Sequence, residues 1–306
     1  MKHPKKITSM AAMMAAIIAI FTSGKDAFGQ LDTTFHPPYF AVADLPSRVL
    51  LLPDGKYVVY FNVETLSDQP TGAITRYLPD GTLDTSFNFS RDYPGVSAAA
   101  GLANGKLIVA AGRLTYGSGD QNHQTEQILR LNADGSIDPS FSSTARTTDG
   151  GVVRAIAIQP DGKILVGGLF TAFNGSPRRG IVRLLSNGTV DPNFAAVTLT
   201  DPPMPFGGVP SGLWTEPKVQ ANGKILIAGD FIGVNGTPCP GVARLNANGS
   251  LDSTFQASGF VPTNSNSPRP IRGIVIQSNG QIVIGGKFTV SATFASNHTG
   301  MTYTRL

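Results

Sequence analysis

Residues 153–170, VRAIAIQPDGKILVGGLF, decide how this chain folds. Isoleucine and alanine alternate before the turn, which is typical of a β-strand with one bulky and one small face. Asp161-Gly162 favours the positive φ angles of a two-residue type I′ turn, and a second apolar run follows at once. The stretch predicts a β-hairpin with strands over residues 153–158 and 163–168.

Two signatures recur along the chain at intervals of about 56 residues. The first is this turn, and its glycines are Gly55, Gly105, Gly162, Gly223 and Gly280. The second has Arg followed by Gly five, Asp eight and Phe eleven residues later, and it begins at Arg76, Arg130, Arg183 and Arg244. Identical spacing in four copies indicates tandem repeats of one unit.

Each unit is expected to form four antiparallel strands, which in the third unit cover residues 153–158, 163–168, 180–185 and 188–194. Four antiparallel strands are the content of one propeller blade. The sequence predicts an all-β fold, a β-propeller of five four-stranded blades, with residues 30–306 as a single domain. Gly167-Gly168 indicates close backbone approach, and Phe170 is expected to wedge between neighbouring sheets.

The two ends of the chain carry complementary parts of the second signature. Residues 31–35 (LDTTF) are its tail, and residues 303–306 (YTRL) are its beginning. Pairing of these ends would close the ring and remove two exposed sheet edges, which β-proteins avoid. A chain cut short is the alternative interpretation.

The repeat resembles the delta-60 repeat family of bacterial extracellular proteins. The resemblance rests on residues 153–170 and on RLNADGSIDPSF over residues 130–141. It implies a propeller-like repeat on an exported protein, and it brings no catalytic residues, because the shared positions look structural.

The first 29 residues have the pattern of a secretory signal peptide. Lys2, Lys5 and Lys6 precede an apolar run over residues 10–21, and Ala27 and Gly29 are the small residues of a cleavage site. Removing this segment, which also holds Lys25 and Asp26, lowers the formal charge from +4 to about +1. A basic pI then no longer favours nucleic-acid binding.

Export to a bacterial periplasm, cell surface or extracellular space follows from this pattern and from the single cysteine, Cys239, which forms no internal disulfide. We expect a monomer with no transmembrane segment after the signal. The Asn-Gly pairs at Asn174 and Asn235 are interpreted as turns rather than glycosylation sites.

Catalytic and metal-binding patterns are not found in the sequence. Asn132-x-Asp134-Gly135-x-x-Asp138 resembles part of a calcium loop, but Arg130 stands where that loop begins with an acid, so we expect Arg130 to pair with Asp138 instead. The histidines lack partners at metal-ligand spacing, and no nucleophile motif appears. We expect no catalytic residue, metal or cofactor.

The candidate binding residues lie on the inner strands and in irregular loops. Arg154 and Arg272 stand eight residues before their turn glycines, share one face and could meet an anion, whereas the alternative is that they are solvated or paired. Glu216 lies on the equivalent strand of the fourth unit. Trp214 and Tyr116 belong to the longest irregular segments, where exposed aromatic rings could bind a sugar or a protein; packing of Trp214 between blades is the alternative.

The function that these features favour is an exported, non-enzymatic binding module for a glycan or a surface protein. An extracellular polysaccharide hydrolase or lyase with channel carboxylates is a second hypothesis. A purely structural spacer is a third.

Overall fold

The computed structural model describes residues 48–60, 74–90, 92–93, 95–112, 126–142, 144–201, 212–255, 260–262, 271–286, 288–290 and 301–305. These residues form β-strands, turns and loops, and none of them lies in a helix. Consequently no helix in this part of the chain could cross a membrane.

Five of the three-stranded sheets, one for each repeat unit of the sequence, follow one another along the chain and are called blades below. Their strands, unit by unit, are β1 (Arg48–Leu51), β2 (Tyr57–Tyr60) and β3 (Ile74–Tyr77); β4 (Gly95–Gly101), β5 (Leu107–Gly112) and β6 (Glu126–Leu131); β7 (Val152–Ile158), β8 (Ile164–Leu169) and β11 (Ile181–Leu184); β13 (Lys218–Val219), β14 (Ile225–Ala228) and β17 (Val242–Leu245); and β19 (Ile271–Ile276), β20 (Ile282–Gly286) and β22 (Met301–Arg305).

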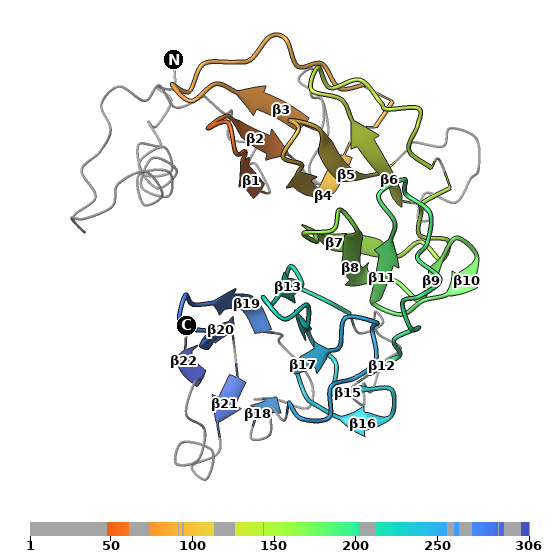
Figure 1. The fold of residues 1–306 in the computed structure, drawn as a ribbon, viewed down its shortest axis with the longest axis vertical. Coiled ribbons are helices and arrows are strands. Elements are labelled where there is room, and N and C mark those ends of the chain that lie inside the picture. Colours follow the sequence, from red (N-terminus) through yellow and green to blue (C-terminus); the bar gives the residue numbers. More distant parts are fainter. Residues whose placement is uncertain are drawn as a thin grey trace, which may run out of the picture.

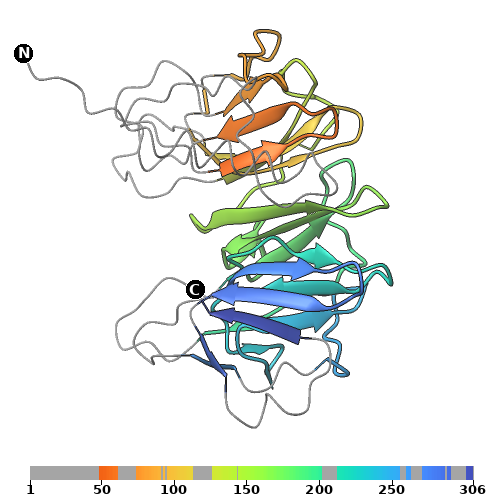
Figure 2. The same cartoon turned by 90° about the vertical axis from the view of Figure 1, so that its left-hand side faces the viewer.

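Three smaller sheets lie at the outer side of the arc. They are formed by β9 (Ala172–Phe173) with β10 (Ser176–Pro177), by β12 (Leu199–Thr200) with β15 (Gly233–Val234) and β16 (Thr237–Pro238), and by β18 (Phe260–Pro262) with β21 (Phe288–Val290). The blades follow one another around an arc, with the first strand of each blade nearest the hollow side (Figure 1). In the view turned by 90°, the first, third and fifth blades lie one below the other (Figure 2).

The expected fourth strand of each blade is much shorter than the sequence suggested. Residues 188–194 contribute only the isolated bridge Leu184↔Val190, and the second unit has the matching bridge Leu131↔Ile137. The chain turns away after this bridge because the Asp of the signature accepts a hydrogen bond from the backbone of the residue two positions later, as Asp138 does from Ser140 (2.9 Å).

The repeated turns also differ from the expected type I′ geometry. In the turn of the third unit only Gly162 has a positive φ (79°), and its amide donates to the Gln159 carbonyl (2.9 Å). This is a three-residue loop with a left-handed glycine at its end. Both residues have positive φ in the outer hairpins at Asn174-Gly175 and Asn235-Gly236, where the turn interpretation of these Asn-Gly pairs is confirmed.

The hydrophobic core lies between adjacent blades. On β8, Ile164 and Val166 face the cluster shared with the second unit, whereas Leu165 faces the cluster shared with the fourth. Phe170 and Phe231 are fully buried in these clusters, as expected for wedges between sheets. A Cβ on Gly168 would lie 2.2 Å from the Val152 carbonyl oxygen, which confirms the predicted close approach.

Ring closure is not found in the described residues. The five blades form an open arc (Figure 1), and residues 31–35 lie outside the described residues. The last strand also differs from the expectation, because β22 pairs with β20 in parallel, while the third strand of each other blade is antiparallel. The chain between β20 and β22, which includes β21, is long enough for the crossover that parallel pairing requires.

The Arg–Asp pairing predicted from the second signature is confirmed in all four copies. Arg Nε lies 2.6–2.9 Å from Asp Oδ2 in the pairs Arg76–Asp84, Arg130–Asp138, Arg183–Asp191 and Arg244–Asp252. Each guanidinium also lies over the Phe ring of its own signature, 4.6–5.1 Å from the ring centroid. One arginine thus joins the Asp and the Phe of its unit.

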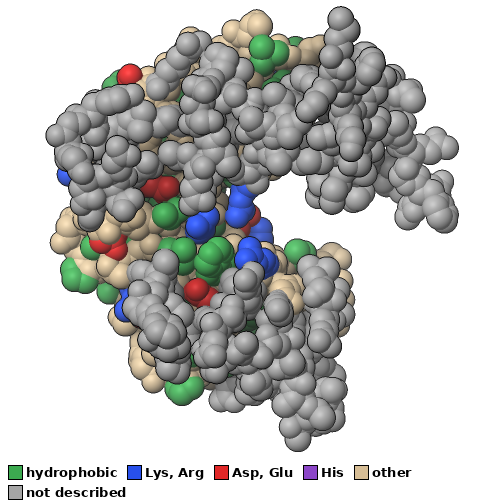
Figure 3. Space-filling model, turned by 180° about the vertical axis from the view of Figure 1, so that it is seen from behind, with side chains coloured by type: hydrophobic (Ala, Val, Ile, Leu, Met, Phe, Trp, Pro, Cys, Tyr) green, Lys and Arg blue, Asp and Glu red, His purple; other side chains and the backbone are tan. Residues whose placement is uncertain are grey.

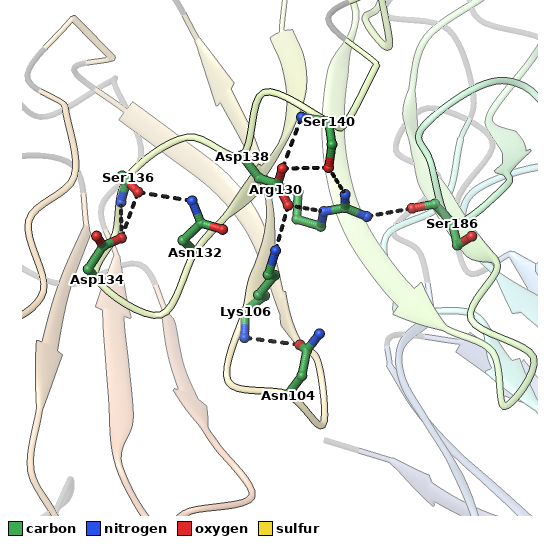
Figure 4. Close-up of polar contacts among 9 residues, drawn as sticks. All are labelled: Asn104, Lys106, Arg130, Asn132, Asp134, Ser136, Asp138, Ser140 and Ser186. Carbon is green, nitrogen blue, oxygen red and sulfur yellow. Dashed lines mark hydrogen bonds and ion pairs between the residues drawn. The ribbon is translucent and has the colours of Figure 1, made fainter.

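The second unit shows the network around the buried aspartate in full (Figure 4). Asp138 accepts hydrogen bonds from Lys106 Nζ (2.7 Å), from the Ser140 hydroxyl (2.6 Å) and from Arg130. Together these hydrogen bonds hold the pKa of Asp138 well below its usual range. The carboxylate remains ionised at neutral pH, so the blade is built around a fixed negative charge.

Three of these arginines also join their own unit to the next one. Arg130 Nη1 donates to the Ser186 carbonyl in the turn of the third unit (2.8 Å), and Arg76 Nη1 donates to the Ala133 carbonyl of the second (2.6 Å). Arg183 donates to Ala247 in the same way. Backbone hydrogen bonds such as Ser142 N–H to Asn187 C=O (2.7 Å) reinforce these contacts.

We expect Arg183→Ala to lower the free energy of unfolding by on the order of 3 kcal/mol, because it leaves a buried carboxylate without a cation. Among the described residues no lysine contacts Asp191, since Lys163 pairs with Asp161 (2.5 Å). Arg130→Ala is the matched comparison and should cost clearly less, because Asp138 keeps Lys106. Urea unfolding of both variants measures the difference, and equal losses would contradict this assignment.

A cationic and aromatic candidate binding site on the inner strands

β-Bulges mark one position on the first strands of three blades. The pairing register skips a residue between β4 and β5 at Ser97, between β7 and β8 at Arg154, and between β19 and β20 at Arg272. All three residues stand eight positions before their turn glycine, and Thr215 stands there in the fourth unit. A bulge leaves its extra residue out of the ladder and re-aims the side chain.

The side chains at this position differ in how far they reach. The hydroxyls of Ser97 and Thr215 each lie within hydrogen-bond distance of the second strand of their own blade, donating to the Ala110 carbonyl (3.5 Å) and the Ala228 carbonyl (3.3 Å). Arg154 and Arg272 are longer and extend beyond their own blades. The third and fifth units thus place guanidiniums where the second and fourth units place short hydroxyls.

Both guanidiniums contact the same indole ring. Arg154 Cζ lies 5.1 Å and Arg272 Cζ 5.3 Å from the ring centroid of Trp214, within the range of cation–π attraction. Trp214 belongs to the fourth unit, between the two arginine-bearing units, and its amide donates to the Ala228 carbonyl (3.3 Å). Residues from three consecutive blades thus meet at one point of the inner wall.

The two arginines of this cluster have no close anionic partner among the described residues, although the charge of Arg154 acts on the carboxyl group of Glu126. Neither Arg154 nor Arg272 forms an ion pair within 4.0 Å among the described residues, and the Nε of Arg154 is buried without a hydrogen-bond partner there. Leaving a buried donor unsatisfied costs about 1–3 kcal/mol. Lys and Arg side chains gather along the hollow side of the molecule (Figure 3). The site is therefore complementary to an anion.

Glu126 lies beside Arg154 and holds the two neighbouring bulges together. Its carboxylate accepts hydrogen bonds from the Val153 amide (2.6 Å), next to the bulge residue Arg154, and from the hydroxyl of the bulge residue Ser97 (2.9 Å). Burial raises the pKa of Glu126 to about 7, although these hydrogen bonds and Arg154 lower it. A carboxyl at the first position of β6 thus links the second blade to the third and titrates near neutral pH.

Two other acidic side chains belong to the same region. Burial raises the pKa of Asp230, whereas the Gly212 amide (2.8 Å) and the Trp214 indole oppose that rise. Glu216 is exposed and pairs with Lys218 (2.8 Å). Burial raises the pKa of Tyr60 as well; Arg48 opposes this rise and Glu216 adds to it.

The structure brings together three of the five residues selected from the sequence. Arg154, Arg272 and Trp214 form one cluster, and Glu216 lies two residues from Trp214. Tyr116 lies outside the described residues. The Trp214 ring is half-buried at the entry to the inner strand of the fourth unit, where the preceding Leu213 bridges to Gly229, so it is neither a fully exposed loop residue nor a fully buried core residue.

Sequence reasoning missed Glu126 and the bulges. Glu126 stands four residues before the signature arginine, where the third and fourth units have Arg179 and Pro240, so its departure from the repeat was the available signal.

The described residues contain no group of three or more His, Cys, Asp or Glu that could hold a metal ion.

Four segments of the chain match a family model described as "Domain of unknown function (DUF5122) beta-propeller": residues 52–87, 102–141, 159–194 and 220–255. These are propeller-type repeats, and each match runs from the first signature to the Phe of the second. Among curated proteins none matches the chain.

Three solved bacterial structures illustrate what this chain is similar to. PorZ, a surface component of the type-IX secretion system of Porphyromonas gingivalis, is 13% identical over 76% of this chain, with a TM-score of 0.41. A protein of unknown function from Dyadobacter fermentans DSM 18053 is 12% identical over 80% (72% of that chain; TM-score 0.35), and an endo-arabinase from Bacteroides thetaiotaomicron VPI-5482 is 13% identical over 83% (92% of that chain; TM-score 0.37). The chain spans 29% of the length of the PorZ chain.

We expect Glu126→Gln to change how stability depends on pH. Because folding raises the pKa of Glu126 from 4.5 to about 7, the wild type should lose about 3 kcal/mol of stability as pH rises from 4.5 to 7. Glutamine stays neutral and can still accept from Val153, so the variant should lack this loss and be the more stable protein at pH 8. Unfolding midpoints at pH 5 and pH 8 test this, with the exposed Glu216→Gln as the control that should behave like wild type.

Proposed function

We propose, from the propeller-type repeats and the arginine pair of the inner wall, that this chain is an exported scaffold that binds an acidic glycan and catalyses no reaction. The observation that carries the proposal is the contact of Arg154 and Arg272 with one indole, Trp214. Export rests on the N-terminal pattern at residues 1–29, with the mature chain beginning near Gln30.

The chemistry of the cluster favours a ligand that combines carboxylates with apolar ring faces. Guanidiniums form paired, charge-assisted hydrogen bonds with carboxylates, and two guanidiniums close to one indole suit a ligand with two acidic groups. The part of the half-buried Trp214 indole that remains exposed adds apolar aromatic surface beside the two guanidiniums. A uronic-acid polymer presents both features in every residue. An acidic segment of a surface protein presents only the carboxylates, so it is the less favoured partner.

Binding of oligogalacturonate to the mature chain tests this function. We expect Arg272→Ala to raise the Kd at least tenfold, because one charge-assisted hydrogen bond contributes about 1.5–3 kcal/mol. Arg178→Ala is the matched control, since Arg178 follows the outer strand β10 and donates to its own neighbour Pro177 (3.0 Å). Isothermal titration with the acidic oligomer and its methyl ester measures both. Equal binding of the ester, or no effect of Arg272→Ala, would contradict the proposal, and selective binding of an acidic peptide would favour the protein partner.

The affinity for this anion should also fall as pH rises through 7. Glu126 loses its proton in this range, and its carboxylate then competes with the ligand for Arg154. Glu126→Gln should remove this pH dependence and bind at pH 8 about as tightly as wild type does at pH 6. Titrations at both pH values provide the measurement, and a wild-type affinity that does not change with pH would exclude Glu126 from the site.

A polysaccharide hydrolase is the second candidate function. The observation that favours it is the pair of acidic groups with raised pKa, Glu126 and Asp230, close to Arg154 and Trp214. A carboxyl that titrates near 7 is suited to general acid catalysis. However, Glu126 is buried and already accepts two hydrogen bonds from its own protein. Release of reducing ends from polygalacturonate by wild type, abolished in Glu126→Gln, would favour this candidate over the binding module.

A further inference from the structure

The two end units of the arc leave apolar side chains uncovered. Five large hydrophobic side chains are exposed among the described residues, and four of them belong to the first and fifth units: Val49 (40%), Leu51 (47%), Leu83 (54%) and Val275 (58%). The four buried hydrophobic clusters join successive blades, and in the described part of the chain none of them joins the fifth blade to the first. Each end unit therefore has a face without a neighbouring blade.

The repeat identifies the neighbour that Val49 and Leu51 are placed to meet. They stand six and four residues before their turn glycine. In the third unit these positions hold Ile156 and Ile158, which pack into the cluster shared with the second unit. The fifth unit uses the same two positions toward the fourth. Val49 and Leu51 thus belong to the side of a blade that packs on a preceding unit, which we call the rear face.

Leu83 lies on the same rear face. It stands one residue before the signature Asp, where the third unit has Val190 and the fourth has Leu251. Both of those residues pack against the cluster shared with the preceding unit. Tyr57 and Val59 on β2 are buried, so the uncovered part of the rear face is formed by the first strand and the signature turn.

Val275 lies on the opposite side of the fifth blade. It stands five residues before its turn glycine, where the second and third units have Ala100 and Ala157. Ala100 packs into the cluster shared with the third unit, and Ala157 packs into the one shared with the fourth. Val275 therefore belongs to the side that packs on a following unit, which we call the front face. Val283 on the neighbouring strand is only half-buried.

The first unit also has the backbone acceptor that an interface between units uses. Arg76, Arg130 and Arg183 donate to the carbonyl two residues before the signature glycine of the next unit. Pro79 holds this position in the first unit, and its carbonyl accepts from no arginine among the described residues. The rear face of the first unit thus has both the apolar residues and the acceptor of a joint between units.

The uncovered rear and front faces are the two halves of the interface that joins successive units inside the chain. Terminal units of repeat proteins usually have a polar outer face, because an apolar one would be exposed to water. The end blades of one molecule lie on either side of the opening of the arc, so their faces do not meet there (Figures 1 and 2). A second copy of the chain presents the matching half to each of them.

We propose that the front face of the fifth unit of one molecule packs on the rear face of the first unit of a second copy. The joint covers Val275 with Val49 and Leu51 and continues the stack of blades from one molecule to the next. It is heterologous, because it joins two different faces, and it leads to a ring of copies if the rotation closes and to a filament if it does not. This assembly replaces the monomer expected from the sequence, and it uses none of the residues of the arginine cluster.

Sedimentation velocity of the mature chain at increasing concentration tests the association. We expect wild type to associate, and we expect Val275→Lys or Leu51→Lys to weaken the association about tenfold or more, because each places an unpaired charge in an apolar joint. Ile137→Lys is the matched control, since Ile137 is exposed on an interior unit, and it should associate like wild type. Equal melting temperatures would show that the three variants are folded.

A mixture of the two end variants identifies the joint. Val275→Lys molecules keep an intact rear face and Leu51→Lys molecules keep an intact front face, so an equimolar mixture should form one-to-one dimers and nothing larger. An interface between two identical faces would instead let one of the variants associate with itself at wild-type strength, which would overturn the proposal. A wild type that stays monomeric at every concentration, as expected if the end blades close on each other within one molecule, or a mixture that stays monomeric would also overturn it.

Discussion

The buried aspartate of the second signature is the constraint on which the rest of this fold depends. A carboxylate removed from water must be surrounded by donors, and Asp138 is surrounded by Arg130, Lys106 and Ser140. Meeting that requirement fixes the turn, the hairpin that supplies the lysine and the strand that supplies the arginine. The arginine in turn covers Phe141, so one charge organises both the polar and the aromatic parts of a blade.

Against this constant frame, the informative residues are the ones in which the units differ. The bulge position holds Ser97, Arg154, Thr215 and Arg272 in successive units, and only the arginines reach another blade. The turn position holds leucine in two units and glutamine in three. A repeat scaffold can vary such positions at little cost, because the network around each aspartate does not include them.

Much of this architecture follows from the sequence because the repeat reports one physical solution several times. The first three strands of each unit, the Arg130–Asp138 pairing and the close approach at Gly168 could be predicted from spacing and residue type, whereas the expected fourth strand is reduced to an isolated bridge. The turn geometry could not, since Asp-Gly is compatible with two loop lengths and the choice depends on the backbone around Gly162. Glu126 was missed because its importance comes from contacts with Ser97 and Val153, which belong to other strands.

The side-chain hydrogen bonds that the signature arginines make to neighbouring units all run in one direction along the chain. Three signature arginines pair within their own blade and also donate to the turn of the C-terminal neighbour: Arg76 to Ala133, Arg130 to Ser186 and Arg183 to Ala247. In repeat arrays, stability is approximately the sum of the stabilities of the single units and of the interfaces between neighbouring units. A link that always runs from one unit to the next gives such an interface a donor side and an acceptor side. The loss of one of these arginines directly weakens the interface with the unit that follows it and removes no arginine contact with the unit that precedes it. The array therefore has a direction, since one side of a linked unit donates through an arginine and the other side accepts through backbone carbonyls. Its two end units consequently present different hydrogen-bonding groups to whatever adjoins them.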